Sequence, residues 1–409
     1  MNTTNTSRRH LVQAGALGLG AAVLGMPGIL RAQTGAPVKV GVLGDFSTAY
    51  ASVGGPALLE GVKMAAEDAG PVLGKPVGVV SADTQLKPDI ASAIARRWYD
   101  TEGVDVITDL PTSAMTFAVM DLARERKKIV LATSASSSDI TGPHCSPYVV
   151  HWVYDTYSIA HSTPTVLAKQ GAKTWFFISQ DTVAGAVSER DVTEVIKGAG
   201  GTVVGSVKVP NNSDDYSSFI LQAKDSKADV IVFSVAGSDA VRVVKQAAEF
   251  GVMKGGQKMT GVYTMPDDIK AMGLDVAQGL IYATAFDWNR NDDSRAFSRR
   301  FLARAGKMPN MNMAGSYSAV LSYLKAVQAA GTRDADQVMA KLRAMTINDP
   351  FVKGGKVRED GRMAHGMYVM QVKSPSQSTG EWDLAQVIAE VPTDVAVRPL
   401  GAGNCPLVK

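Results

Sequence analysis

The chain has 409 residues, a formal net charge of +3, 45% hydrophobic residues and 7% aromatic residues. This composition is typical of a globular protein, and the length predicts two domains. A small net charge with both signs mixed lacks the basic surface that nucleic acids or anionic lipids require, so we expect no nucleic-acid partner.

The first 32 residues have the pattern of an export signal. Arg8 and Arg9 precede an apolar run of 20 residues, and Leu30-Arg31-Ala32 then offers small or apolar residues for cleavage. A basic start, an apolar middle and a small-residue exit are typical of a signal peptide, and paired arginines favour the twin-arginine route. An uncleaved membrane anchor is the alternative, because such a run is just long enough to span a bilayer. The glycines in the run favour cleavage near Ala32, which predicts a periplasmic protein whose mature chain has a formal charge of 0.

The chain has two cysteines, Cys145 and Cys405. An even count in an exported protein predicts one disulfide, whereas two cysteines in a cytosolic protein are usually free thiols. The bridge closes a loop of about 260 residues, for which the chain-entropy model gives at most roughly 5 kcal/mol.

Short β-branched runs alternate with helical periodicity from residue 38 onward. The pattern predicts strands at 38–43, 77–80, 104–107, 129–132, 174–178, 203–204, 230–234, 260–263 and 367–372. It predicts helices at 58–66, 90–98, 113–126, 294–305 and 313–330. This alternation indicates an α/β fold of parallel sheets with helices on both faces. Because one open sheet does not comfortably hold so many strands, we predict two similar lobes that divide near residues 150–158.

Motifs of the common enzyme classes are missing from the chain after the predicted signal peptide. It contains no HExxH, CxxC, GxSxG or GxxxxGK[ST] sequence. His151 and His161 lack metal-ligand spacing on either a helix or a strand. We therefore expect a protein that is not an enzyme and that holds no metal and no cofactor. An exported enzyme stays as an alternative, because a catalytic triad that loops assemble has no characteristic spacing.

Several short segments, taken in order, give a resemblance to a known family. They are Val38–Ser47, Gly54–Ala66, Val79–Asp83, the helix start at Asp89, Leu110–Met115, Ala132–Ser136 and Lys245–Gly251. In order and spacing they resemble the periplasmic binding proteins of the branched-chain amino acid type, the leucine/isoleucine/valine receptors of ABC importers. The resemblance covers nearly all of the mature chain.

The resemblance implies the type I periplasmic binding fold, with two Rossmann-like, doubly wound lobes joined by a three-crossover hinge. Lobe 1 is then residues 38–155 and 287–362, lobe 2 is residues 156–286 and 363–395, and residues 396–409 are a C-terminal tail. It also implies a monomer that closes on a small molecule and presents it to ABC transporter permease subunits. A ligand sensor for a membrane signalling system uses the same closure and remains an alternative.

Ser113, Ala135 and Ser136 are the candidate ligand contacts on lobe 1. Ser113 stands at a predicted helix start, where its hydroxyl and free backbone N–H groups suit an anion. The alternative is that Ser113 only caps its own helix. Ala135 and Ser136 follow the next strand, at the edge where open α/β sheets bind ligands. The resemblance implies that these positions contact the ligand's carboxylate and amino group, whereas the alternative is an ordinary polar loop.

Lobe 2 departs from the family's pattern. Ala184 stands where amino acid receptors of this type usually have an aromatic residue, so we expect a larger or differently shaped pocket. The family's acidic partner for an ammonium group is not evident near Met265, and a buried ammonium without such a partner is costly. Asp239 is a substitute candidate, and capping of its helix is the alternative.

Three aromatic residues are candidates for stacking on a flat ligand: Phe46, Tyr50 and Tyr263. Ordinary loop packing is the alternative for Phe46 and Tyr50. The anion-binding half of the family's site is therefore recognisable in the sequence, and the ammonium-binding half is not. We expect a small carboxylate ligand, with aromatic and aliphatic acids as eligible as branched-chain amino acids.

Overall fold

The computed structural model describes residues 35–408, and the predicted signal peptide lies outside them. The chain forms one compact unit from Ala36 onward. Within the described residues, no helix has both the length and the apolar character needed to cross a membrane.

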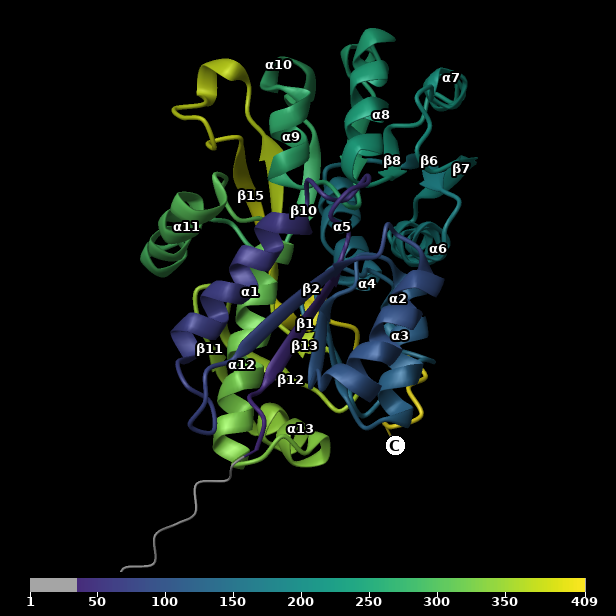
Figure 1. The fold of residues 1–409 in the computed structure, drawn as a ribbon. Helices are drawn as coiled ribbons and strands as arrows, with labels where there is room; N and C mark the ends of the chain where they lie inside the picture. Colours follow the sequence, from purple (N-terminus) through teal and green to yellow (C-terminus); the bar gives the residue numbers. More distant parts are fainter. Residues whose placement is uncertain (1–34, 409) are drawn as a thin grey trace, which may run out of the picture. The chain divides into compact units, whose positions relative to one another are not determined.

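The first sheet has five parallel strands in the order β2-β1-β3-β4-β5. Figure 1 labels β1 and β2 of this sheet. Its strands are β1 (Lys39–Gly44), β2 (Gly78–Asp83), β3 (Val106–Asp109), β4 (Ile129–Ala132) and β5 (Val149–His151). The helices between them are α1 (Gly55–Ala69), α2 (Pro88–Arg97) and α3 (Ser113–Glu125), with the π-turn η1 (Trp98–Glu102) after α2 and the 3-10 turn η2 (Ser138–Thr141) after β4. The central strands β3 and β4 are buried along their whole length, as expected of a parallel sheet with both faces covered.

The second sheet has seven strands in the order β15-β14-β10-β9-β8-β6-β7. Its strands are β6 (Thr174–Gln180), β7 (Thr202–Val209), β8 (Val230–Ser234), β9 (Lys258–Gly261), β10 (Ile281–Thr284), β14 (Met367–Val372) and β15 (Ala385–Val391). Strands β6 to β10 run parallel, and β14 and β15 join antiparallel at one edge. The accompanying helices are α6 (Val183–Gly198), α7 (Ser217–Asp225), α8 (Gly237–Glu249), α9 (Pro266–Met272) and α10 (Leu274–Ala277).

Both sheets share one strand order. In each, the first strand lies between the second and the third, which gives 2-1-3-4-5 in the first sheet and 7-6-8-9-10 in the second. The direction of winding therefore reverses between β1 and β3 and again between β6 and β8. Ligands of open α/β sheets bind at the carboxyl ends of strands beside such a reversal.

From β5 to β14 the chain passes between the two sheets three times. The first passage, after β5, contains α4 (Thr156–Ala160) and α5 (Thr163–Lys169). After β10 the chain returns, and α11 (Asp292–Ala305) and α12 (Met311–Ala330) pack against α1 of the first sheet's layer. The third passage follows α13 (Ala335–Ala344) and a small sheet of β11 (Ile347–Asn348), β12 (Lys353–Val357) and β13 (Met363–Ala364), before β14. The exact lobe boundaries remain predictions.

The passages between the sheets are held by a buried arginine. Arg362 is 1% exposed, and its guanidinium donates to the backbone oxygens of His151 at 3.0 Å and Met363 at 2.9 Å. Its Nε lies 3.3 Å from the carboxylate of Asp155. Burial works against a charge on Asp155, but the neighbouring Arg362 keeps the pKa of this carboxyl below its usual range. One ion pair thus joins the first and third passages.

Cys145 and Cys405 form a disulfide, as predicted from the cysteine count. The bridge fixes the C-terminal segment, which follows β15 and α14 (Thr393–Ala396), to the loop before β5. It closes a loop with a sequence separation of 260 residues.

Candidate ligand-binding site

A cavity of about 570 Å³ lies at the carboxyl ends of the strands of both sheets. Segments that follow β1, β3 and β4 line one side, and segments that follow β6, β8 and β9 line the other. Both reversals of winding therefore face the same cavity. Its volume is within the range of small-molecule sites.

The start of α3 forms part of the cavity wall. Thr112 precedes the helix and caps it, because its Oγ1 accepts a hydrogen bond from the Met115 N–H at 3.3 Å. Ser113 is the first helical residue, and its Oγ instead accepts the Ser137 N–H at 3.1 Å. The alternative that Ser113 only caps its own helix is therefore wrong. Ser113 and Ala114 both line the cavity, where the first N–H groups of a helix have no intrahelical acceptor and carry partial positive charge.

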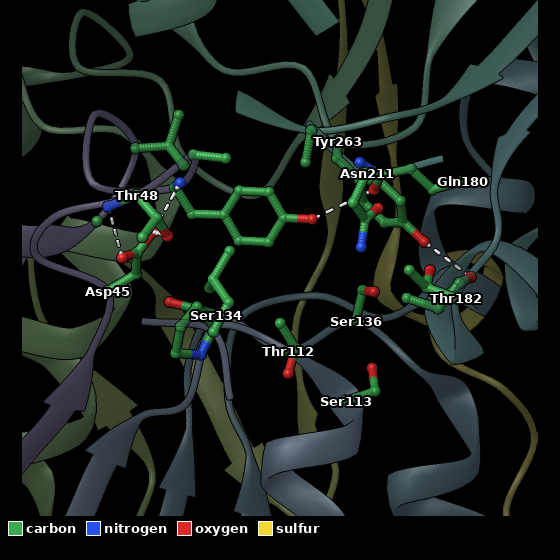
Figure 2. Close-up of a pocket in the computed structure, with 18 of the residues that line it drawn as sticks. Asp45, Thr48, Thr112, Ser113, Ser134, Ser136, Gln180, Thr182, Asn211 and Tyr263 are labelled. Atoms are coloured by element: carbon green, nitrogen blue, oxygen red, sulfur yellow. Dashed lines mark hydrogen bonds between the residues drawn. The ribbon is translucent and has the colours of Figure 1, made fainter. Parts of the chain in front are cut away.

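Hydroxyl groups gather around this helix start. Figure 2 shows Thr112, Ser113 and Ser136 on one side of the cavity, with Gln180 and Thr182 opposite them. Ala135 does not line the cavity, and its backbone oxygen lies 2.8 Å from Nε2 of the buried His151.

The loop after β1 brings Tyr50 into the cavity. The carboxylate of Asp45 accepts four hydrogen bonds within this loop, among them from the Thr48 N–H at 2.9 Å and the Tyr50 N–H at 2.8 Å. The Tyr50 hydroxyl then donates to the side-chain oxygen of Gln180 at 3.2 Å. Phe46 does not line the cavity, because its backbone N–H is bonded to Asp83 at 3.1 Å and its ring lies against the end of β1.

Ala184 and Tyr263 lie together on the other side. The Tyr263 hydroxyl donates to the backbone oxygen of Ala184 at 2.9 Å. Burial raises the pKa of Tyr263 to about 12, so its hydroxyl keeps its proton at neutral pH. Both residues line the cavity, as does Met265.

Asp239 lines the cavity with its charge already compensated. One carboxylate oxygen lies 2.8 Å from Nη1 of Arg242, and the other accepts from Nε2 of Gln180 at 3.2 Å and the Asn212 N–H at 2.9 Å. Ala236 precedes α8, and no side chain caps that helix. The alternative of helix capping by Asp239 is therefore wrong.

Asp109 and Gln180 are cavity residues that the sequence analysis missed. Asp109 ends β3, is 1% exposed, and accepts a hydrogen bond from the Ser134 hydroxyl at 2.6 Å through Oδ1. Among the described residues its Oδ2 has no hydrogen-bond partner. Burial, with a smaller contribution from the charge of Asp45, raises the pKa of Asp109 to about 7. The one available signal was an acidic residue at a strand's carboxyl end.

The described residues contain no group of three or more His, Cys, Asp or Glu side chains that could hold a metal ion. Two doubly wound sheets whose strand ends share one polar-lined cavity define a protein that encloses a small solute. The chain belongs to the periplasmic binding protein family, whose model matches residues 37–380. This family is extracytoplasmic and non-catalytic, which excludes the exported enzyme.

Three relatives illustrate the membership. A periplasmic binding protein from Burkholderia mallei is 42% identical, with a TM-score of 0.88 over 91% of this chain and 99% of that one. A branched chain amino acid ABC transporter periplasmic ligand-binding protein from Burkholderia xenovorans is 39% identical, with a TM-score of 0.83 over 91% of this chain and 100% of that one. The Leu/Ile/Val-binding protein homolog 6 of Brucella melitensis is 24% identical over 84% of this chain and 89% of its own length.

Proposed function

We propose that this protein is the solute receptor of an ABC importer and that it binds a small carboxylate in the cavity between the sheets. The eligible ligands are amino acids and aromatic or aliphatic acids. The receptor acts as a monomer that meets the permease subunits of its transporter. It is exported by the twin-arginine route and cleaved near Ala32, so the mature protein recovered from the periplasm should begin at residue 33. An N-terminal sequence that begins at Met1 would contradict the cleavage.

The main support for a carboxylate ligand is that the N-terminus of α3 lines the cavity. Helix N-termini favour anions because their free N–H groups point outward and the helix dipole is positive there. Here Ser113 and Ala114 line the cavity, and Ser136 adds a hydroxyl beside them. A carboxylate at this position receives several hydrogen bonds without a cationic side chain.

Contacts between segments on opposite sides of the cavity support the proposal that the two lobes close on the ligand. Arg190 of α6 pairs with Asp139 of η2 at 3.0 Å, and the Ser138 hydroxyl donates to Asp191 at 2.7 Å. These pairs join segments from opposite sides of the cavity. A ligand held by both sides favours the closed state by its extra contacts there.

Calorimetry on the ligand-free protein tests the proposal. The panel contains amino acids, benzoate-type acids and dicarboxylates, together with an uncharged amide of each acid. We expect binding of at least one acid and none of its amide. Binding of uncharged compounds alone would contradict the anion site.

Ser113→Leu should abolish binding, because the larger side chain fills the space before the helix start, and the fold should stay intact by circular dichroism. Ser217→Leu is the matched control, since Ser217 is the first residue of α7 and does not line the cavity. Equal binding by the Ser113 variant and the unaltered protein would place the ligand elsewhere.

A further inference from the structure

The loop after β1, residues 45–54, has a shape that is fixed from within. The carboxylate of Asp45 is 1% exposed and accepts four hydrogen bonds from the loop. The carbonyl of Tyr50 accepts the N–H groups of Val53 and Gly54, both at 3.1 Å. The loop is therefore a firm surface against which segments from the other side of the cavity can dock.

The start of α8, which follows β8 of the second sheet, docks on this loop. The Ser238 N–H donates to the Ala49 carbonyl at 3.4 Å. Gly237 begins the helix with a φ of +60°, and a Cβ at this position would stand 2.2 Å from the Ala49 oxygen. The contact therefore requires a glycine. Gly237 does not line the cavity, so a methyl group there would block the contact without touching a bound solute.

Asn310 connects the same loop to α9, which follows β9 of the second sheet. Its Oδ1 caps α12, because it accepts the N–H groups of Asn312 at 3.0 Å and Met313 at 3.1 Å. Its Nδ2 donates to the Val53 carbonyl at 2.9 Å and to the Asp267 carboxylate at 2.8 Å. The two ends of one side-chain amide thus have separate roles, one in the helix cap and one in the bridge to α9.

Lys307 forms a second bridge beside Asn310. Its Nζ donates to the Ser52 carbonyl at 2.7 Å and lies 2.6 Å from the carboxylate of Asp267, whose side chain is 5% exposed. A buried carboxylate that loses such partners is costly, so these contacts favour the arrangement in which the two sides meet. None of Lys307, Asn310 and Asp267 lines the cavity. The bridges therefore join its two sides without contacting a bound solute.

We infer that residues 45–54 form a clasp that holds the two sides of the cavity together, and that Gly237 and Asn310 are the positioning residues that let it engage. This inference rests on the proposed function and adds to it a device that sets how long a solute stays enclosed. Contacts that form after a solute has entered slow its release more than they change its entry. The release rate is therefore the quantity that the clasp controls.

Asn310→Asp tests the bridge to α9. Aspartate keeps the oxygen that caps α12, but it replaces the donor to Val53 and Asp267 by an oxygen that repels both acceptors. Release should be about 10- to 100-fold faster, as for the loss of a hydrogen bond to a charged group, with a nearly unchanged association rate. Asn291→Asp is the matched control, because Asn291 caps α11 through the Ser294 N–H at 2.9 Å and does not line the cavity.

Gly237→Ala tests the contact with α8, and Gly251→Ala is its control. Gly251 follows the same helix with a φ of +67°, and a Cβ there would meet nothing within 4 Å beyond its chain neighbours. Both variants acquire the same backbone strain, so their urea midpoints should fall by similar amounts. Only Gly237→Ala should release a bound solute faster, because only its new methyl group meets the clasp.

The release rate is measured by rapid filtration with radiolabelled leucine, benzoate and succinate, each chased with an excess of the unlabelled compound. Circular dichroism checks that every variant is folded. The clasp is overturned if either Asn310→Asp or Gly237→Ala releases the bound probe at the rate of the unaltered protein, or if a control releases it as fast as its partner variant. Those results would leave the proposed function in place. Binding of none of the three probes would instead contradict the proposed function, and the clasp with it.

Discussion

The phenol hydroxyl of Tyr50 lies 3.2 Å from the side-chain oxygen of Gln180 and donates a hydrogen bond to it across the cavity. Tyr50 lies in the loop after β1 and Gln180 ends β6, so the bond joins the loop after the first strand of one sheet to the end of the first strand of the other. Gln180 in turn donates to Asp239, which Arg242 holds in place. Gln180, which accepts the hydrogen bond from Tyr50, is therefore itself held in place by Asp239.

Tyr50→Phe should weaken ligand binding about 3- to 10-fold, because it removes one hydrogen bond of the closed state and keeps the ring. Burial keeps the pKa of Tyr50 above its ordinary value, so the hydroxyl is a donor at neutral pH. Tyr148→Phe is the control, since its hydroxyl is bonded to Asp336 at 2.7 Å outside the cavity. Calorimetry measures the ligand affinity of both variants and of the unaltered protein. Equal affinities for all three would show that the hydrogen bond between Tyr50 and Gln180 does not favour closure.

Arg362→Met should lower the free energy of unfolding by about 3–5 kcal/mol, because it leaves the Asp155 charge buried and unpaired. Arg124→Met removes an exposed ion pair with Asp121 at 3.0 Å and should change the free energy by less than about 0.5 kcal/mol. Urea unfolding at pH 7 compares the two variants. A similar, small loss in both would mean that the buried pair does not hold the passages between the sheets.

The buried His151 should make the protein less stable in acid. Burial and the nearby Arg362 lower the pKa of His151 to about 4, against an ordinary value near 6.5, so it stays neutral in the folded state. The unfolded chain binds this proton first, and stability is therefore lost as the pH falls from 6.5 towards 4. The effect of this one group is on the order of 3 kcal/mol.

The contribution of His151 to the acid sensitivity is measured by comparing two variants with the unaltered protein. His151→Gln should show a smaller loss of unfolding free energy between pH 7 and pH 4 than the unaltered protein, whereas the exposed His144 changed to Gln should show the same loss. Identical pH profiles for the two variants would assign the acid sensitivity to other groups.

Removal of the disulfide should destabilise the protein without affecting the cavity. Cys145→Ala together with Cys405→Ala should cost about 2–5 kcal/mol of unfolding free energy, since the bridge closes a loop of 260 residues. Ligand affinity at 25 °C should not change, because neither cysteine lines the cavity. A thiol titration of the denatured, unreduced protein should find no free thiols, and two free thiols would contradict the bridge.

Much of the fold was predictable because many strands are uninterrupted apolar runs. The predicted strands at 230–234 and 367–372 coincide with β8 and β14. Sequence patterns did not predict β10 or β15. β15 is an edge strand with much of its length exposed, so its sequence has no uninterrupted apolar run.

The site was predictable where the residue type alone suits the position. Ser113 and Ser136 were identified from their places after strands and Ala184 from the resemblance to the family, and all three line the cavity. Asp109 was not identified, because its importance depends on a partner for one oxygen and none for the other, and that partner is 25 residues away. The packing of the Phe46 ring likewise depends on residues that are distant in the sequence. The backbone N–H of Phe46 is bonded to Asp83, which is 37 residues away.

The most direct test of a carboxylate receptor is a crystal structure of the protein purified without denaturation from its own periplasm, with the bound solute identified by mass spectrometry. The carboxylate oxygens should lie within hydrogen-bond distance of Ser113 and Ser136, at the start of α3. A solute without an acidic group in the cavity, or a carboxylate bound away from α3, would contradict the proposal.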